Sequence, residues 1–107
     1  MQVLQSHTFK NTVKKLHKNQ KESLDEAVKV ILANPLIGEL KKGYLAEIRV
    51  YKFRMINNLT LVAYKYDEQN SIIKFFALGS HENFYRDLKS IYESHHSRAI
   101  PYNKTSA

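Results

Sequence analysis

The spacing of apolar residues changes near Gly43, and this change restricts the chain to folds that combine helices with a sheet. Before Gly43, apolar residues recur every three or four positions, which predicts amphipathic helices over about 8–17 and 20–33. The Asn34-Pro35 pair ends the second helix, because proline disfavours the α conformation in the residue before it. The first half of the chain is therefore expected to form a helical hairpin.

The second half follows the two-residue repeat that is typical of β-strands. Three segments are rich in β-branched and aromatic residues: 45–55, 59–66 and 72–78. Short turn sequences separate them. Short turns between consecutive strands predict antiparallel pairing, and residues 2–6 form a candidate opening strand. Ser80 is a candidate N-cap for a short helix over about 82–92.

These elements predict an α+β fold. We expect the N-terminal helical hairpin to pack on one face of a twisted, mainly antiparallel sheet of about four strands, followed by a short C-terminal helix. The other face of the sheet is expected to be open for function. The 107 residues fit one domain, which we expect to span residues 1–94, and a polar, mobile tail over 95–107.

Composition excludes several classes of site. Cysteine is absent, which excludes disulfides and thiolate metal sites. No pair of histidines has the spacing of a metal site with a carboxylate, so we expect neither a metal nor another cofactor. Neither a signal peptide nor a run of about 20 apolar residues is present, so we expect a cytoplasmic protein without a membrane partner.

The net charge indicates the kind of partner. Lysine and arginine total 17 against 10 acidic residues, which gives a charge of +7 and a pI near 9.6. An excess of this size attracts polyanions at long range. A nucleic acid is therefore a candidate partner, and an acidic protein is a second one.

Charged residues follow the first long strand. Glu47 and Arg49 alternate with apolar neighbours, and the phase then slips by one position before Lys52 and Arg54. A β-bulge near Tyr51 or Lys52 would restore the alternation, so that all four charged residues share one face. The alternative is a solvated strand face with incidental charges.

A second polar cluster follows the last predicted strand. His81 comes directly after the strand end, where side chains can reach a ligand, and histidine transfers protons near neutral pH. Tyr85 lies four positions further, which is one helical turn, so both side chains can face one cleft. The alternatives are a capping or surface histidine and an ordinary core aromatic residue.

Three segments together resemble the RelE/ParE toxins, and more closely their RelE/YafQ-like ribonuclease branch. Residues 33–43 (ANPLIGELKKG) match the NP-L-G-x-L-KG turn of that family. Residues 48–54 (IRVYKFR) and 61–64 (LVAY) resemble its R-x-R … L-x-Y strands. Residues 77–85 (ALGSHENFY) resemble its closing G-T/S-H-x-x-x-F/Y segment. The resemblance extends over nearly the whole chain to about Ser90.

The resemblance implies a type II toxin that cuts messenger RNA in the ribosomal A site without a metal. In such members the ribose 2′-hydroxyl attacks the adjacent phosphate, which requires a base, an acid and cations for the phosphorane charge. By this resemblance His81 and Tyr85 are the candidate catalytic pair, and Arg49 and Arg54 the candidate phosphate-binding arginines. The expected RNA-binding set is Lys41, Lys42, Glu47 and Lys52, with Glu47 able to orient a base.

The resemblance also implies a cognate antitoxin, expected to be acidic or amphipathic and to lie across the sheet or the helical hairpin. Two alternative functions remain at this stage. One is a ParE-like poison of DNA gyrase, which shares the fold but usually lacks a histidine at the position of His81. The other is a non-catalytic module that keeps the fold and the basic face and binds nucleic acid or protein.

Overall fold

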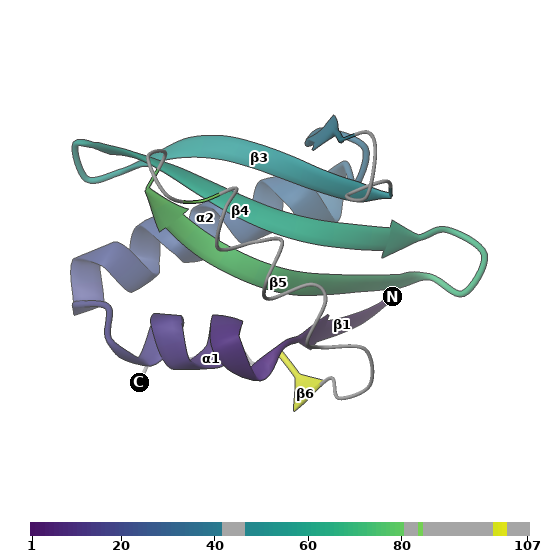
Figure 1. Ribbon diagram of the computed structural model, residues 1–107, viewed down its shortest axis with the longest axis horizontal. Coiled ribbons are helices and arrows are strands. Elements are labelled where there is room, and N and C mark those ends of the chain that lie inside the picture. The colour runs from purple at the N-terminus through teal and green to yellow at the C-terminus, as the bar shows by residue number, and fades with distance from the viewer. Residues whose placement is uncertain (42–46, 81–83, 85–99, 103–107) are drawn as a thin grey trace.

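A computed structural model describes residues 1–41, 47–80, 84 and 100–102 of the chain (Figure 1). Two helices precede most of the sheet, and the described residues form eight elements in chain order. They are β1 (Gln2–Gln5), α1 (His7–Lys14), α2 (Lys18–Ala33), β2 (Glu39–Leu40), β3 (Ile48–Met55), β4 (Asn58–Asp67), β5 (Ile72–Ser80) and β6 (Ile100–Pro101). The predicted α+β fold with an N-terminal helical hairpin is thus confirmed.

Ser6 explains where the first helix begins. Its hydroxyl accepts a hydrogen bond from the Phe9 backbone N–H at 3.0 Å, which makes it the N-cap of α1. The same hydroxyl donates to the carbonyl of Phe76 at 2.8 Å. One buried side chain therefore both starts α1 and fixes that start to the middle of β5.

The strands form one sheet in the order β2-β3-β4-β5-β1-β6. Four of its five strand pairs are antiparallel, and β1 runs parallel to β5. The predicted mainly antiparallel sheet is confirmed, but it has six strands instead of about four. The two additional strands are β2 and β6, each of two residues, which is too short for a period to be visible in the sequence.

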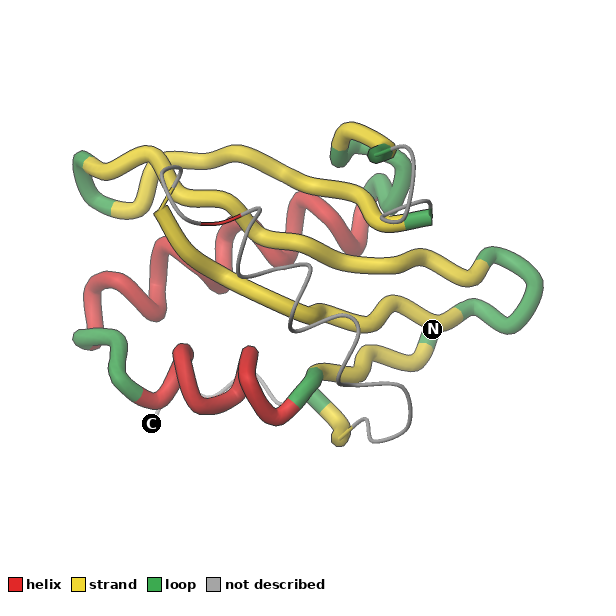
Figure 2. Tube along the Cα trace, in the orientation of Figure 1, coloured by secondary structure: helices red, strands yellow, loops and turns green. Residues whose placement is uncertain are grey.

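The main core lies between the sheet and the two helices. Figure 2 shows α2 crossing behind the strands and α1 along the lower margin of the sheet. The core consists of Phe9, Leu24, Val28, Ile31, Met55, Val62, Tyr64, Ile73 and Phe75. Phe9 stacks on Phe75 with ring centroids 5.3 Å apart, which joins α1 to β5.

A second apolar cluster lies on the opposite face of the sheet. It consists of Ile48, Val50, Leu61, Ala63, Phe76, Ala77 and Phe84. Ile48, Leu61 and Ala63 are fully buried. The expectation that this face is open is therefore wrong for its centre, and only its ends remain accessible. Phe84 has a helical backbone, while the rest of the predicted helix over 82–92 lies outside the described residues.

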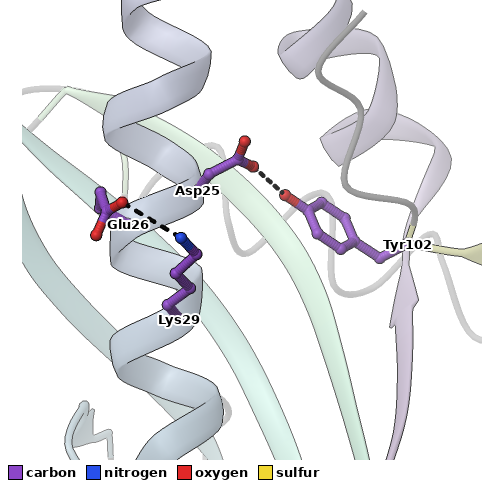
Figure 3. A network of polar contacts seen from close by, with 4 residues as sticks. All are labelled: Asp25, Glu26, Lys29 and Tyr102. Atoms are coloured by element: carbon purple, nitrogen blue, oxygen red, sulfur yellow. Dashed lines mark hydrogen bonds and ion pairs between the residues drawn. The ribbon is translucent and has the colours of Figure 1, made fainter.

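Residues 100–102 are attached to the N-terminal strand. β6 pairs with β1, and the Tyr102 N–H donates to the Val3 carbonyl at 3.0 Å. The Tyr102 phenol reaches Asp25 of α2 at 3.3 Å, beside the Glu26–Lys29 ion pair (Figure 3). Three residues of the expected mobile tail thus lie at the sheet edge, where β6 pairs with β1 and the Tyr102 ring packs on the core.

Candidate nucleic-acid interface

The charged residues of β3 divide between the two faces of the sheet. β3 and β4 pair residue by residue from Ile48↔Lys65 to Met55↔Asn58 without interruption, so the predicted bulge near Tyr51 or Lys52 is wrong. The sheet has its irregularity elsewhere, between β4 and β5 at Ala63/Tyr64. Because successive residues of a regular strand point to opposite faces, Lys52 and Arg54 share one face and Arg49 lies on the other.

Burial on both faces of β3 explains the apparent slip in its sequence. Ile48 and Val50 belong to the second apolar cluster, whereas Tyr51, Phe53 and Met55 contact the helix-side core. The apolar residues thus change face along the strand, because one face is buried at the start of β3 and the other face is buried towards its end. No extra residue is needed to account for the pattern.

Arg49 is bound to the loop after α2. Its guanidinium donates to the carbonyl of Gly38 at 2.8 Å and to that of Leu36 at 3.2 Å. The side chain therefore satisfies loop carbonyls on the helix-side face. The predicted convergence of Arg49 and Arg54 on one surface is wrong.

Tyr64, opposite Arg49 on β4, holds the same loop. Its buried phenol donates to the Pro35 carbonyl at 2.7 Å and accepts from the Gly38 N–H at 2.9 Å. The pKa of this phenol is raised above its ordinary value, mainly because the phenol is buried. A Cβ at Gly38 would lie 2.8 Å from the phenol oxygen, so only glycine fits there. The ANPLIG and LVAY segments thus contact each other directly.

Lys52 and Arg54 lie near the end of β3, in the strand positions that face away from the helices, and Arg54 also lines a small pocket between β3 and α2. Both side chains are exposed, and Arg54 makes a long hydrogen bond, of 3.5 Å, to the Asn57 carbonyl in the adjoining turn. Their exposure and common face leave both cations accessible to an anion. This pair is the part of the predicted site that the structure brings together.

Two other residues of the predicted RNA-binding set are engaged in ion pairs. Lys41 pairs with Glu39, and the hydrogen bond and charge of Lys41 lower the pKa of that carboxyl, with a smaller effect from the charge of Lys52. Glu47 pairs with Lys65 at 3.8 Å. Glu47 lies about 23 Å from Arg54 along the strand, at roughly 3.3 Å per residue, which separates it from that end of the site.

β5 ends at the same end of the sheet as the one where the exposed cations Lys52 and Arg54 lie. Gly79 pairs with Leu61, which in turn pairs with Lys52, and Ser80 pairs with Thr60. The chain therefore leaves the sheet at the same end as β3, with β4 between the two strands. His81, Tyr85 and Lys42 lie outside the described residues, so their predicted roles stay predictions.

A cleft of about 320 Å³ adjoins this end of the sheet on the helix side. It lies between α1, the start of α2, the start of β4 and the end of β5, and residues such as Asn58 and Ser80 line it. Its lining is uncharged. It offers amide and hydroxyl groups, whereas the cations lie on the other face.

Two lysines that the sequence did not single out lie on the face that carries Lys52 and Arg54, at the other end of the strands. Lys65 of β4 and Lys74 of β5 are directly opposite each other in the register. The ammonium group of Lys74 lies 4.8 Å from the centre of the Phe76 ring. The available signal was a single lysine within an apolar strand, in Tyr64-Lys65-Tyr66 and again in Ile73-Lys74-Phe75.

Over residues 1–41, 47–80, 84 and 100–102, no three histidine, cysteine, aspartate or glutamate side chains gather in a way that could hold a metal ion. In the same part of the chain no helix is long and apolar enough to cross a bilayer.

Comparison with known proteins gives one family and several similar structures. Residues 3–89 match the profile described as the ParE-like toxin of type II bacterial toxin-antitoxin systems. No curated protein sequence matches significantly. The intact RelBE toxin–antitoxin complex of E. coli contains a chain with a TM-score of 0.62 and 16% identity, over 75% of this chain and 95% of that one.

Two other solved structures have the same fold. A mutant of the E. coli toxin RelE in the free state gives a TM-score of 0.65 at 16% identity, over 84% of this chain and 93% of that one. A RelBE complex from Mycobacterium tuberculosis gives 0.54 at 16% identity, over 75% and 96%. At this level of identity the likeness establishes the shared fold.

Proposed function

The chain belongs to the ParE-like toxin family of type II bacterial toxin–antitoxin systems, and we propose that it cleaves messenger RNA on the ribosome. The family membership confirms the resemblance to the RelE/ParE toxins. The observation that carries the proposed activity is the pair of exposed cations, Lys52 and Arg54, on one face at the sheet end where β5 leads into His81.

The proposed reaction is an internal transesterification. The ribose 2′-oxygen forms a bond to the adjacent phosphorus while the bond to the 5′-oxygen of the next nucleotide breaks, which leaves a cyclic phosphate and a free 5′-hydroxyl. A base accepts the 2′-hydroxyl proton, and an acid gives a proton to the leaving oxygen. In our proposal His81 transfers one of these protons, and Tyr85 lies beside the reacting phosphate.

Lys52 and Arg54 have the electrostatic role in this proposal. Negative charge increases on the phosphate oxygens as the phosphorane forms, and a well-placed donor lowers that barrier by roughly 3–4 kcal/mol. Arg49 is no longer included, because its guanidinium is bound to the carbonyls of Leu36 and Gly38. Its effect on activity should be indirect, through the loop that it holds.

The test is to map RNA 5′ ends after brief induction of the protein, and to measure cleavage of ribosome-bound messenger RNA by purified variants. Arg54→Ala and His81→Ala should each lower cleavage about a hundredfold or more. Lys10→Gln is the matched control, because it removes an exposed cation from α1, on the other face. Unchanged cleavage in both variants, or equal loss in the control, would contradict the proposed site.

Poisoning of DNA gyrase is the second candidate, because the matching profile is described as ParE-like. A supercoiling assay with purified gyrase separates the two functions. Gyrase inhibition without new RNA 5′ ends would replace the ribonuclease proposal with this one.

We also propose a cognate antitoxin of net negative charge, acting with the toxin in the cytoplasm. The charge of +7 favours such a partner, since complementary charge accelerates association. Association should therefore slow as salt is added. A strongly basic partner, or association that is insensitive to salt, would contradict the electrostatic part of this proposal.

A further inference from the structure

The opposed pair Lys65 and Lys74 lies on the same face as Lys52 and Arg54 but at the other end of the strands. Lys65 is opposite Ile48 on one side and Lys74 on the other, and Ile48 belongs to the cluster on that face. Both lysines are half-buried. The two lysines therefore lie directly opposite each other on adjacent strands.

This arrangement does not favour folding by itself. Like charges directly opposite each other on neighbouring strands are destabilising. Glu47, the one carboxylate within ion-pair distance of Lys65 among the described residues, is 71% exposed and lies at 3.8 Å, so it compensates little. No carboxylate in the described part of the chain pairs with Lys74. Burial, and then the charge of Lys65, lowers the pKa of Lys74.

Arrangements of residues that destabilise the folded protein locally are expected at sites that bind a ligand. Here an anion that binds both lysines would supply the negative charge that offsets their repulsion. The Phe76 ring supports the Lys74 ammonium group at 4.8 Å and limits its movement, so the cation is held in place.

We infer that Lys65 and Lys74 form a second phosphate-binding site, which holds the RNA backbone at a distance from the proposed cleavage site. From Leu61, opposite Lys52, to Lys65 is four residues of β4, or about 13 Å at roughly 3.3 Å per residue. A nucleic-acid strand carries one phosphate per nucleotide, so a single strand can place different phosphates at the two sites. Four cations along one face fit the repeating charge of a polyanion. For the identity of its ligand, the inference rests on the proposed RNA-directed function.

The test measures binding of a labelled single-stranded RNA oligonucleotide at a series of salt concentrations. Lys65→Gln and Lys74→Gln should each weaken binding and reduce the slope of log affinity against log salt by about 0.7, the value for one phosphate contact on a single strand. The same variants should unfold at equal or higher temperature, because a repulsion has been removed. Lys74→Arg, which keeps the charge, should bind like the wild type.

Lys10→Gln serves as control, because it removes one exposed charge from α1, which packs on the other face. Slopes for the two lysine variants equal to that of the control would overturn the inference. It would equally be overturned if they weakened binding of an acidic antitoxin peptide and left RNA binding unchanged. If the wild type binds RNA with the expected slopes but cuts none, the proposed cleavage fails and this site stands.

Discussion

The hydroxyl of Tyr64 makes a prediction possible about the loop after α2. In Tyr64→Phe the ring is kept and only the hydroxyl is lost. That hydroxyl is both donor to the Pro35 carbonyl and acceptor for the Gly38 N–H, and the Tyr64 side chain is fully buried. The variant therefore leaves two backbone groups without their partner, and only one of them can be reached easily by water.

The magnitude follows from the cost of unpaired buried groups. Each buried donor or acceptor that loses its partner costs about 1–3 kcal/mol. Pro35 is half-buried and Gly38 is buried, so the Gly38 N–H should dominate, and we expect a loss of about 2–4 kcal/mol in the free energy of unfolding. For a chain of 107 residues this lowers the melting temperature by roughly 10–20 °C.

The assay is urea unfolding followed by far-ultraviolet circular dichroism, combined with a double-mutant cycle. Arg49→Met removes the two bonds to Gly38 and Leu36, so both variants release the same loop. The double variant should then lose less than the sum of the single losses, by about 0.5–2 kcal/mol. Gln20→Ala removes a cap bond at the start of α2, and its effect should add to that of Tyr64→Phe.

Two results would refute the reasoning. One is a loss below about 0.5 kcal/mol in Tyr64→Phe, which would mean that water replaces the phenol at both backbone groups. The other is strict additivity of the Tyr64 and Arg49 variants, because the two side chains would then not share one loop.

Two further predictions concern the β3–β4 turn and the C-terminal strand. Ile56 has a positive φ of 61° in an exposed turn, which a β-branched residue rarely adopts, so Ile56→Asn should raise the free energy of unfolding by about 1 kcal/mol in urea. No gain would show that the turn is unstrained. Burial, and then the charge of Asp25, raises the pKa of the Tyr102 phenol, so its contribution to stability is present below about pH 10 and lost as the pH rises further. The fall in stability above that pH should be shallower in Tyr102→Phe, and an identical fall would contradict this assignment.

The helices and the long strands could be predicted because their signals are local. The apolar repeat and the Asn34-Pro35 stop are read within one segment, and α2 indeed ends at Ala33. The strand boundaries were also close, but the β3–β4 turn is formed by Ile56 and Asn57 alone, because Asn58 already belongs to β4. A hairpin turn that contains an isoleucine at positive φ carries no recognisable turn signal.

The site was harder to predict, because it depends on which face of the sheet is covered. Arg49 and Arg54 look equivalent in the sequence, and only the register and the loop carbonyls separate them. The second apolar cluster depends on Phe84, which lies far along the chain from β3. Lys65 and Lys74 become a pair only through the alignment of β4 with β5. Relations between strands and faces of this kind have no signature within a single segment.

The position of β1 has a consequence for the order of events during synthesis. Its partners in the sheet are β5, some 70 residues later in the chain, and β6, as in the bond between Gln5 and Pro101, which are 96 positions apart. At ~5–20 residues per second, β1 waits about 4–14 s on the ribosome before β5 has been made. The β3–β4 hairpin, which carries Lys52 and Arg54, needs only neighbouring residues and can form earlier. The cationic strand is therefore formed while the first strand of the nascent chain still has an unpaired edge.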